Sequence, residues 1–185
     1  MRIEVRIGGF GGQGVITMGH ILGTAASLRL GLNAVMTQSY GPEARGGACK
    51  TDIVVSDTAI DYPKTTRLDC LIAMSPNAYN RYIRDVREGG FVIFDSSLFD
   101  IVDKVSGIKY IGVEATKIAQ KIGNSQAANV VMIGALSGAM DLFNIDALGS
   151  VVTERFPKAS VINLKALEAG AEAAKRVKES HRSLP

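Results

Sequence analysis

The stretch RIEVRIGGFGGQGV, residues 2–15, decides the fold class of this chain. Apolar side chains alternate with charged ones over residues 3–7, which is the period of a β-strand. A cluster of glycines follows, and apolar residues then recur from Val15 to Leu28 at the spacing of one helix face. Gly31 is a suitable stop for that helix. The chain therefore begins with a strand, a tight glycine turn and a helix.

The same kind of alternation continues along the chain. Apolar or alternating runs predict further strands at residues 33–40, 48–56, 68–73, 91–94 and 109–113. Helical spacing predicts helices at residues 115–122, 126–140, 145–156 and 163–180. Another helix is predicted to begin at Pro76, behind the N-cap Ser75, and to end near Glu88 before Gly89 and Gly90.

Strands that alternate with helices, several of them continuously apolar, indicate the α/β class. We expect an open, mostly parallel, Rossmann-like sheet with helices on both faces and a helical C-terminus. We find no linker, repeat or low-complexity tract, so residues 1–185 are expected to form a single domain.

Composition argues against several functions. The chain has 185 residues with 46% hydrophobic and 21% charged residues, and its net charge of +3 is too mild for a nucleic-acid-binding footprint. We expect no membrane span, because no apolar run reaches about 18 residues, and no signal peptide, because charges interrupt the first ten residues. The two cysteines form no CxxC motif, so we expect no zinc or iron–sulfur ligation, and free thiols suit a reducing cytoplasm.

The glycine turn, residues 9–14, fits the pattern G-x-G-x-x-G between a strand and a helix. The helix N-terminus offers unpaired N–H groups and a partial positive charge, which suit an anion. A dinucleotide site also needs an acid about 20 residues further on, but Thr37, Gln38 and Ser39 occupy those positions. Three interpretations stay open: the glycines only allow tight packing, they hold an anionic or partner-bound group, or they bind a dinucleotide.

A second loop, SYGPEARGG at residues 39–47, combines turn-forming residues with Glu43 and Arg45 at the end of a predicted strand. Ligands of open α/β sheets gather at the carboxyl ends of strands, so we expect this loop to lie beside the glycine turn. Arg45 could hold a carboxylate or phosphate in a bidentate manner. Equally, Glu43 and Arg45 could pair with each other or with a neighbouring subunit.

The two turns supply all candidate residues for cofactor binding or for an interface. They are Gly9, Gly11, Gly12, Gln13, Gly14, Ser39, Tyr40, Gly41, Pro42, Glu43, Arg45, Gly46 and Gly47. We predict no catalytic residue and no metal ligand in this chain; His20 and His181 are read as structural or solvated.

The two turns together resemble the gamma subunit of the 2-oxoacid:ferredoxin oxidoreductases. The match rests on GFGGQGV at residues 9–15 and QSYGPEARGG at residues 38–47. It extends through IDYP at 60–63, DCLIA at 69–73, SPNAY at 75–79, Asn129 with GAL at 134–136, and NLKALEAG at 163–170. The resemblance covers roughly residues 3–175, and the second loop is its most specific part.

The resemblance implies a subunit of an enzyme that oxidatively decarboxylates a 2-oxoacid to an acyl-CoA and passes electrons to external ferredoxin. It implies no cofactor bound by this chain alone: thiamine diphosphate, Mg and iron–sulfur clusters belong to partner subunits, and CoA is a co-substrate. The expected partners are the alpha and beta subunits, which bind thiamine diphosphate, and a ferredoxin-like delta subunit. The isolated chain is expected to be inactive.

Within this family, residues 44–49 are most similar to the 2-oxoglutarate type. Pyruvate-type members more often have a second arginine where Ala44 stands. We expect docking against the thiamine-binding subunits, and part of the wall of the entrance for CoA or substrate, to come from Gly11, Gly12, Gln13 and Arg45. Two alternatives remain: a stand-alone Rossmann-type nucleotide-binding protein, and a purely structural assembly subunit.

The helix predicted over residues 126–140 is rich in small residues, with Gly134 and Gly138 four apart. This spacing allows another backbone to approach closely. We expect that contact to lie within the chain, with a subunit interface as the alternative.

Overall fold

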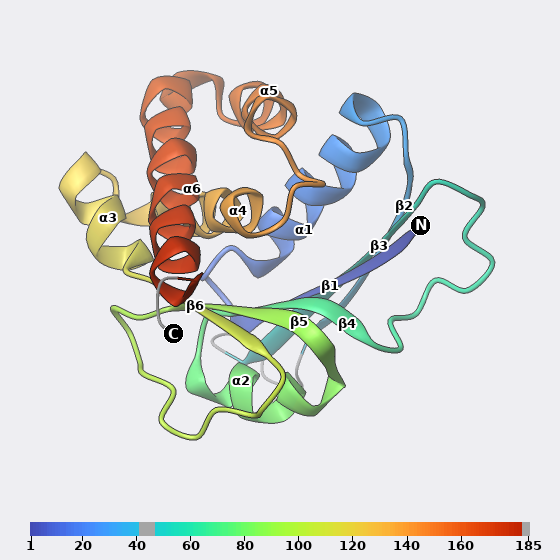
Figure 1. Ribbon diagram of the computed structural model, residues 1–185. Helices are drawn as coiled ribbons and strands as arrows, with labels where there is room; N and C mark the ends of the chain where they lie inside the picture. Colours follow the sequence, from blue (N-terminus) through green and yellow to red (C-terminus); the bar gives the residue numbers. More distant parts are fainter. Residues whose placement is uncertain (41–46, 183–185) are drawn as a thin grey trace.

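The computed structural model describes residues 1–40 and 47–182, and strands from this part of the chain form one six-stranded sheet. The strand order across the sheet is β2-β3-β1-β4-β5-β6 (Figure 1). The strands are β1 (Arg2–Phe10), β2 (Asn33–Tyr40), β3 (Ala48–Ser56), β4 (Leu68–Ala73), β5 (Val86–Asp95) and β6 (Lys109–Val113).

The directions of the strands bring the ends of β1 and β2 to one edge of the sheet. The pairs β1–β4, β4–β5 and β5–β6 are parallel, whereas β3 runs antiparallel to both β1 and β2. Since β2 and β1 are both antiparallel to β3, they point the same way. Cys49 of β3 lies opposite Gly9 on one side and opposite Tyr40 on the other. The expectation of an open, mostly parallel sheet is confirmed, with an antiparallel portion at one side.

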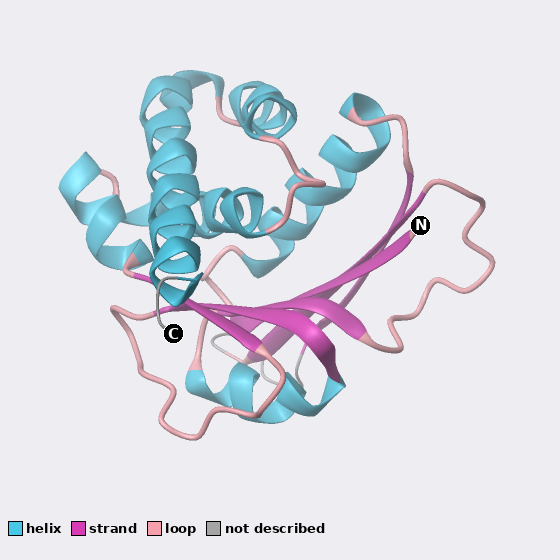
Figure 2. Ribbon diagram, in the orientation of Figure 1, coloured by secondary structure: helices cyan, strands magenta, loops and turns pink. Residues whose placement is uncertain are grey.

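Helices cover both faces of the sheet, but unequally (Figures 1 and 2). One face carries α1 (Val15–Thr24) with a π-helical turn (Ala25–Arg29), and also α3 (Ala115–Ile122), α4 (Ala128–Ala139), α5 (Ile145–Arg155) and α6 (Ser160–Arg182). Short 3-10 turns precede α4 (Ser125–Ala127) and α6 (Pro157–Ala159). The other face carries α2 (Pro76–Tyr82) and a 3-10 turn (Ile83–Asp85). Two separate apolar cores result, the larger one beneath α1 and α4.

The close contact expected for the small residues of α4 lies inside the chain. Helix α4 packs against α6, and Gly134 and Gly138 leave no room for a side chain. A Cβ on Gly134 would lie 2.0 Å from the carbonyl oxygen of Leu167, and one on Gly138 would lie 2.3 Å from that of Ala171. The two helices therefore touch backbone to backbone, and the expected burial of these glycines is confirmed.

The helix predicted to run from Pro76 to about Glu88 is wrong at its C-terminal end. Helix α2 ends at Tyr82, and β5 begins at Val86, so Gly89 and Gly90 lie within a strand. Val86 is opposite Leu68, and the register shifts between Leu68 and Cys70. Between these two pairs β5 has three residues more than β4, and Gly89, with a φ of 76°, lies in that irregular segment. Pairing with β4 thus overrides the local signal for a helix stop.

Candidate functional site

The glycine turn connects β1 to α1 at the edge of the sheet where β1, β2 and β4 end. Gly12 and Gly14 have φ values of 96° and 76°, which side chains with a Cβ rarely adopt. A Cβ on Gly14 would lie 2.4 Å from Asn129 Nδ2, whereas one on Gly12 would have no atom within 4 Å. Gly14 therefore allows α1 to pack against α4, while the backbone at Gly12 stays open to approach.

Gln13 ties the ends of two strands together. Its Oε1 accepts a hydrogen bond from the Phe10 N–H at 2.7 Å, and its Nε2 donates to the Met74 carbonyl at 2.9 Å. Phe10 ends β1, and Met74 directly follows β4. The amide is thus used within the chain, and the predicted contact of Gln13 with a ligand or partner stays a prediction.

The second loop begins and ends beside the glycine turn. The Gly11 N–H donates to the Gly47 carbonyl at 3.0 Å, which joins the turn to the segment leading into β3. Ser39 and Tyr40, at the end of β2, are exposed, Tyr40 to 65%. The expected adjacency of the two turns is therefore confirmed. The remaining predicted loop residues, Gly41, Pro42, Glu43, Arg45 and Gly46, lie outside the described residues.

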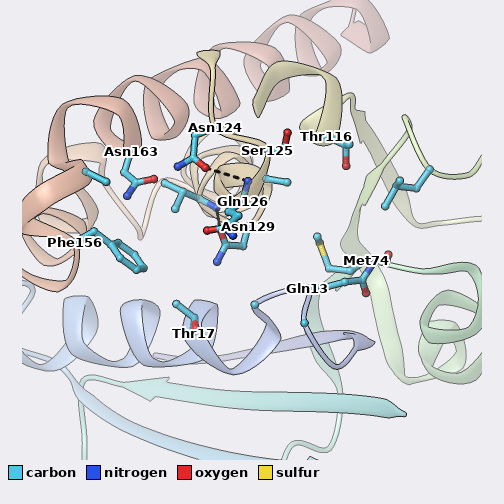
Figure 3. Close-up of a pocket in the computed structure, with 16 residues that line it drawn as sticks. Gln13, Thr17, Met74, Thr116, Asn124, Ser125, Gln126, Asn129, Phe156 and Asn163 are labelled. Carbon is cyan, nitrogen blue, oxygen red and sulfur yellow. Dashed lines mark hydrogen bonds between the residues drawn. The ribbon is translucent and has the colours of Figure 1, made fainter. Parts of the chain in front are cut away.

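A cavity of about 500 Å³ opens beside the glycine turn, between α1, the start of α4 and the start of α6 (Figure 3). Gly12, Gln13 and Gly14 form one wall. Neutral polar side chains supply most of the rest: Thr17, Thr116, Asn124, Ser125, Gln126, Asn129 and Asn163. Met74, Leu98 and Phe156 add apolar surface. No charged residue of the described chain lines this cavity, so it suits a ligand group recognised by hydrogen bonds.

Sequence reasoning missed the helical side of this cavity. From the sequence, Asn129 and Asn163 were named only among the residues that carry the family resemblance. Thr17, Asn124 and Gln126 were not named as candidate site residues. These residues come from three helical segments that are distant in sequence, and no local motif predicts that they lie around one cavity. Asn124 gave no separate signal, because its side chain caps the turn before α4 by accepting from the Gln126 N–H, a role in which asparagine is common.

An ion network on the opposite face of the sheet was also missed. Arg6 of β1 is 6% exposed, and its guanidinium donates to both carboxylate oxygens of Asp52 in β3, at 2.5 and 3.0 Å. It also donates to the carboxylate of Asp85 and lies over the Tyr82 ring, 4.8 Å from its centroid. Lys50 donates to Asp52 at 2.9 Å. Glu4 and Arg6 of β1 are thus buried on this face, whereas Arg2 at the start of the strand is exposed.

Asp52 stays ionised because of these partners. Burial alone would raise its pKa, but hydrogen bonds and positive charge from Arg6 and Lys50 outweigh burial and hold the pKa below its ordinary value. The network fixes β1 against β3 just before the two turns.

Comparisons with known proteins decide the family. Residues 4–173 match the pyruvate ferredoxin/flavodoxin oxidoreductase family. The chain belongs to that family. It is 46% identical over 179 residues to the 2-oxoglutarate synthase subunit KorC of Methanothermobacter marburgensis, covering 93% of this chain and 96% of the relative. It is 42% identical over 181 residues to the subunit of the same name from Methanocaldococcus jannaschii, covering 96% of each chain.

A solved structure supports the same assignment. The gamma subunit of a keto/oxoacid ferredoxin oxidoreductase from Geobacter sulfurreducens superposes with a TM-score of 0.85 at 33% identity, covering 96% of this chain and 98% of that one. The expected family, fold class and enzyme class are confirmed: this is a gamma-type oxidoreductase subunit chain.

Within residues 1–40 and 47–182, no three His, Cys, Asp or Glu side chains gather in a way that could bind a metal ion. None of the described helices combines the length and the apolar character needed to cross a membrane.

Proposed function

We propose that this chain is the gamma subunit of a thiamine-diphosphate-dependent oxidoreductase that decarboxylates 2-oxoglutarate to an acyl-CoA and passes the electrons to ferredoxin. The observation that carries the proposal is the similarity to 2-oxoglutarate synthase subunits over almost the whole length of both chains. The Ala44 position, where pyruvate-type chains more often have a second arginine, supports the same substrate.

In this proposal, thiamine diphosphate, Mg and the iron–sulfur clusters are held by the alpha, beta and delta partner subunits in the cytoplasm. The edge formed by the two turns faces those partners and the entrance for CoA. Phe10 and Tyr40 are the last residues of β1 and β2 on that edge and both are exposed, which supports a docking role. Aromatic side chains are enriched at protein interfaces.

Purification of the chain from its native source tests the assembly. We expect thiamine-binding and iron–sulfur subunits to co-purify, and the complex to reduce ferredoxin with a higher kcat/KM for 2-oxoglutarate than for pyruvate. A chain that purifies alone and binds NAD tightly would contradict the proposal and favour a stand-alone nucleotide-binding protein.

Substitution of Arg45 tests the edge in the assembled complex. Arg45→Ala is expected to lower acyl-CoA formation, because the guanidinium would no longer hold an anionic group there. Arg84→Ala, at an exposed arginine in the turn after α2, is the matched control and should retain full turnover. Normal assembly with unchanged turnover in the Arg45 variant would leave a purely structural role for this loop.

A further inference from the structure

Strand β2 (Asn33–Tyr40) has a neighbouring strand on one side only. It lies at the end of the strand order, next to β3, and pairs with β3 residue for residue over all eight positions (Figure 1). The other side is called here the free side of β2. Its backbone N–H and C=O groups have no hydrogen-bond partner among residues 1–40 and 47–182. Such a row of open groups is a template for another extended strand.

The free side of β2 lacks the features by which proteins usually prevent such pairing. The strand sequence NAVMTQSY contains no charged residue and no proline, and its register with β3 shows no irregularity. At the opposite side of the sheet, β6 has only five residues, begins with Lys109 and contacts α6. No residue of β2 is buried, whereas every other strand of the sheet has several buried residues. Strand β2 is therefore intact, unprotected and open to a partner strand.

The side chains of β2 favour a second copy of the same strand as that partner. When a two-fold axis relates two antiparallel strands, residues that lie opposite each other point to the same face of the sheet. Ala34, Met36 and Gln38 alternate with Val35 and Thr37, and the first three share the face covered by α1. None of these residues is charged, so self-pairing brings no like charges together, as a charged strand would.

One register uses the strand best. With Met36 on the two-fold axis, Ala34 lies opposite Gln38 of the second copy, and Val35 lies opposite Thr37. Residues 34–37 are the less exposed half of the strand, so this register covers the apolar side chains of Val35 and Met36 further. The pair of Val35 and Thr37 joins two β-branched side chains, which pack well across neighbouring strands.

We propose that two copies of this chain associate through β2, which pairs antiparallel with its own copy about a two-fold axis at Met36. The two six-stranded sheets then form one continuous sheet. Tyr40 lies beyond the paired residues and stays available at the carboxyl ends of the strands. The association goes beyond the proposed function and does not depend on the substrate. Because one pair of strands is a small interface, the dimer is expected to be weak and concentration-dependent.

Sedimentation velocity of the full chain, from micromolar to submillimolar concentration, tests the association. We expect the mass in solution to rise toward twice the 19.6 kDa of one chain. A chain that stays monomeric over the whole range would overturn the proposal. If the amides of residues 33–40 were then protected from hydrogen exchange only in the assembled oxidoreductase, the strand would belong to a partner subunit instead.

Cysteine cross-linking tests the register. Ala34→Cys and Gln38→Cys chains are mixed in the presence of oxidised glutathione. Opposite residues of antiparallel strands have Cα atoms about 4.5–5.5 Å apart, which suits a disulfide. We expect disulfide-linked dimers in the mixture but not with either variant alone, because the two copies of position 34 lie four residues, or about 13 Å, apart along the strands. Cys49 and Cys70 are buried and should not take part.

A mixture of Ala34→Cys with Gln120→Cys, at an exposed glutamine of α3, is the matched control and should give no cross-link. Neither Ala34 nor Gln38 is buried, so both variants should fold, and a circular dichroism melt of each checks this. Dimers that sediment as such, but cross-link no more in the test mixture than in the control, would show that another surface associates and would refute the pairing of β2.

Discussion

The backbone contact between α4 and α6 gives a sharp prediction about stability. Gly170 of α6 faces Val131 of α4, and a Cβ added to Gly170 would lie 1.9 Å from the Val131 carbonyl oxygen. Real Cβ atoms essentially never approach closer than 3.0 Å, so Gly170→Ala requires the two helices to separate by about 1 Å. The obstructing atom belongs to a helix backbone and cannot rotate away.

The magnitude follows from two opposing effects. Overpacking of this kind typically costs about 1–3 kcal/mol, and a clash with backbone belongs at the upper end of that range. Alanine in place of glycine in a helix returns about 1 kcal/mol through its higher helix propensity. The expected net loss is therefore about 2 kcal/mol, or about 4–8 °C in Tm for a chain of this length.

The matched control is Gly23→Ala in α1. Gly23 is also helical, but an added Cβ there would have no atom within 4 Å. That variant should gain up to about 1 kcal/mol from helix propensity alone. Urea unfolding followed by circular dichroism measures both variants. If Gly170→Ala is as stable as Gly23→Ala, the inferred backbone contact between α4 and α6 is wrong.

Three further outcomes are expected. Arg6→Met should lose about 3–5 kcal/mol in urea unfolding, because Asp52 would keep a buried charge without its main partner; a loss below about 1 kcal/mol would exclude this role for the ion pair. The pKa of Asp52 is lower in the folded than in the unfolded chain, where it is about 3.9. Its ion pair therefore stabilises the fold above about pH 3.9, and this stability is lost as the pH falls through the folded-state pKa. In urea unfolding measured from pH 6 to pH 2, the free energy of unfolding should therefore fall less in the Arg6 variant than in the wild type. Cys49 and Cys70 are buried, and burial raises the pKa of both thiols, so neither should react with a thiol reagent at pH 7 until urea unfolds the chain; rapid labelling of the native protein would show that β3 or β4 opens.

Local patterns were sufficient for most secondary structure. The strands at residues 33–40, 48–56, 68–73 and 109–113 and the helix at residues 115–122 have the predicted bounds. In these segments the period of apolar residues agrees with the surrounding turns. The prediction failed after Tyr82, because a pair of glycines is compatible both with the end of a helix and with an irregularity inside a strand.

For the site, the sequence indicated the two turns and their adjacency, which the hydrogen bond between Gly11 and Gly47 confirms. It did not indicate that Gln13 would bond within the chain, or that Asn163 would come from α6 to face the glycine turn. Those contacts join residues more than 60 positions apart. No local sequence pattern predicts which of the many distant residues will meet.

By itself, then, the sequence determined the α/β class, the strand–turn–helix opening, the glycine-lined edge and the family, because each depends on residues close together or on a long match to known chains. Only the tertiary structure decided that β3 lies antiparallel between β1 and β2, that Arg6 and Asp52 are buried as a pair, and that neutral amides from three helical segments surround one cavity. A period of two tells which residues of a strand share a face, but not which strand lies beside it or what covers that face. Those choices are made by the packing of the whole chain.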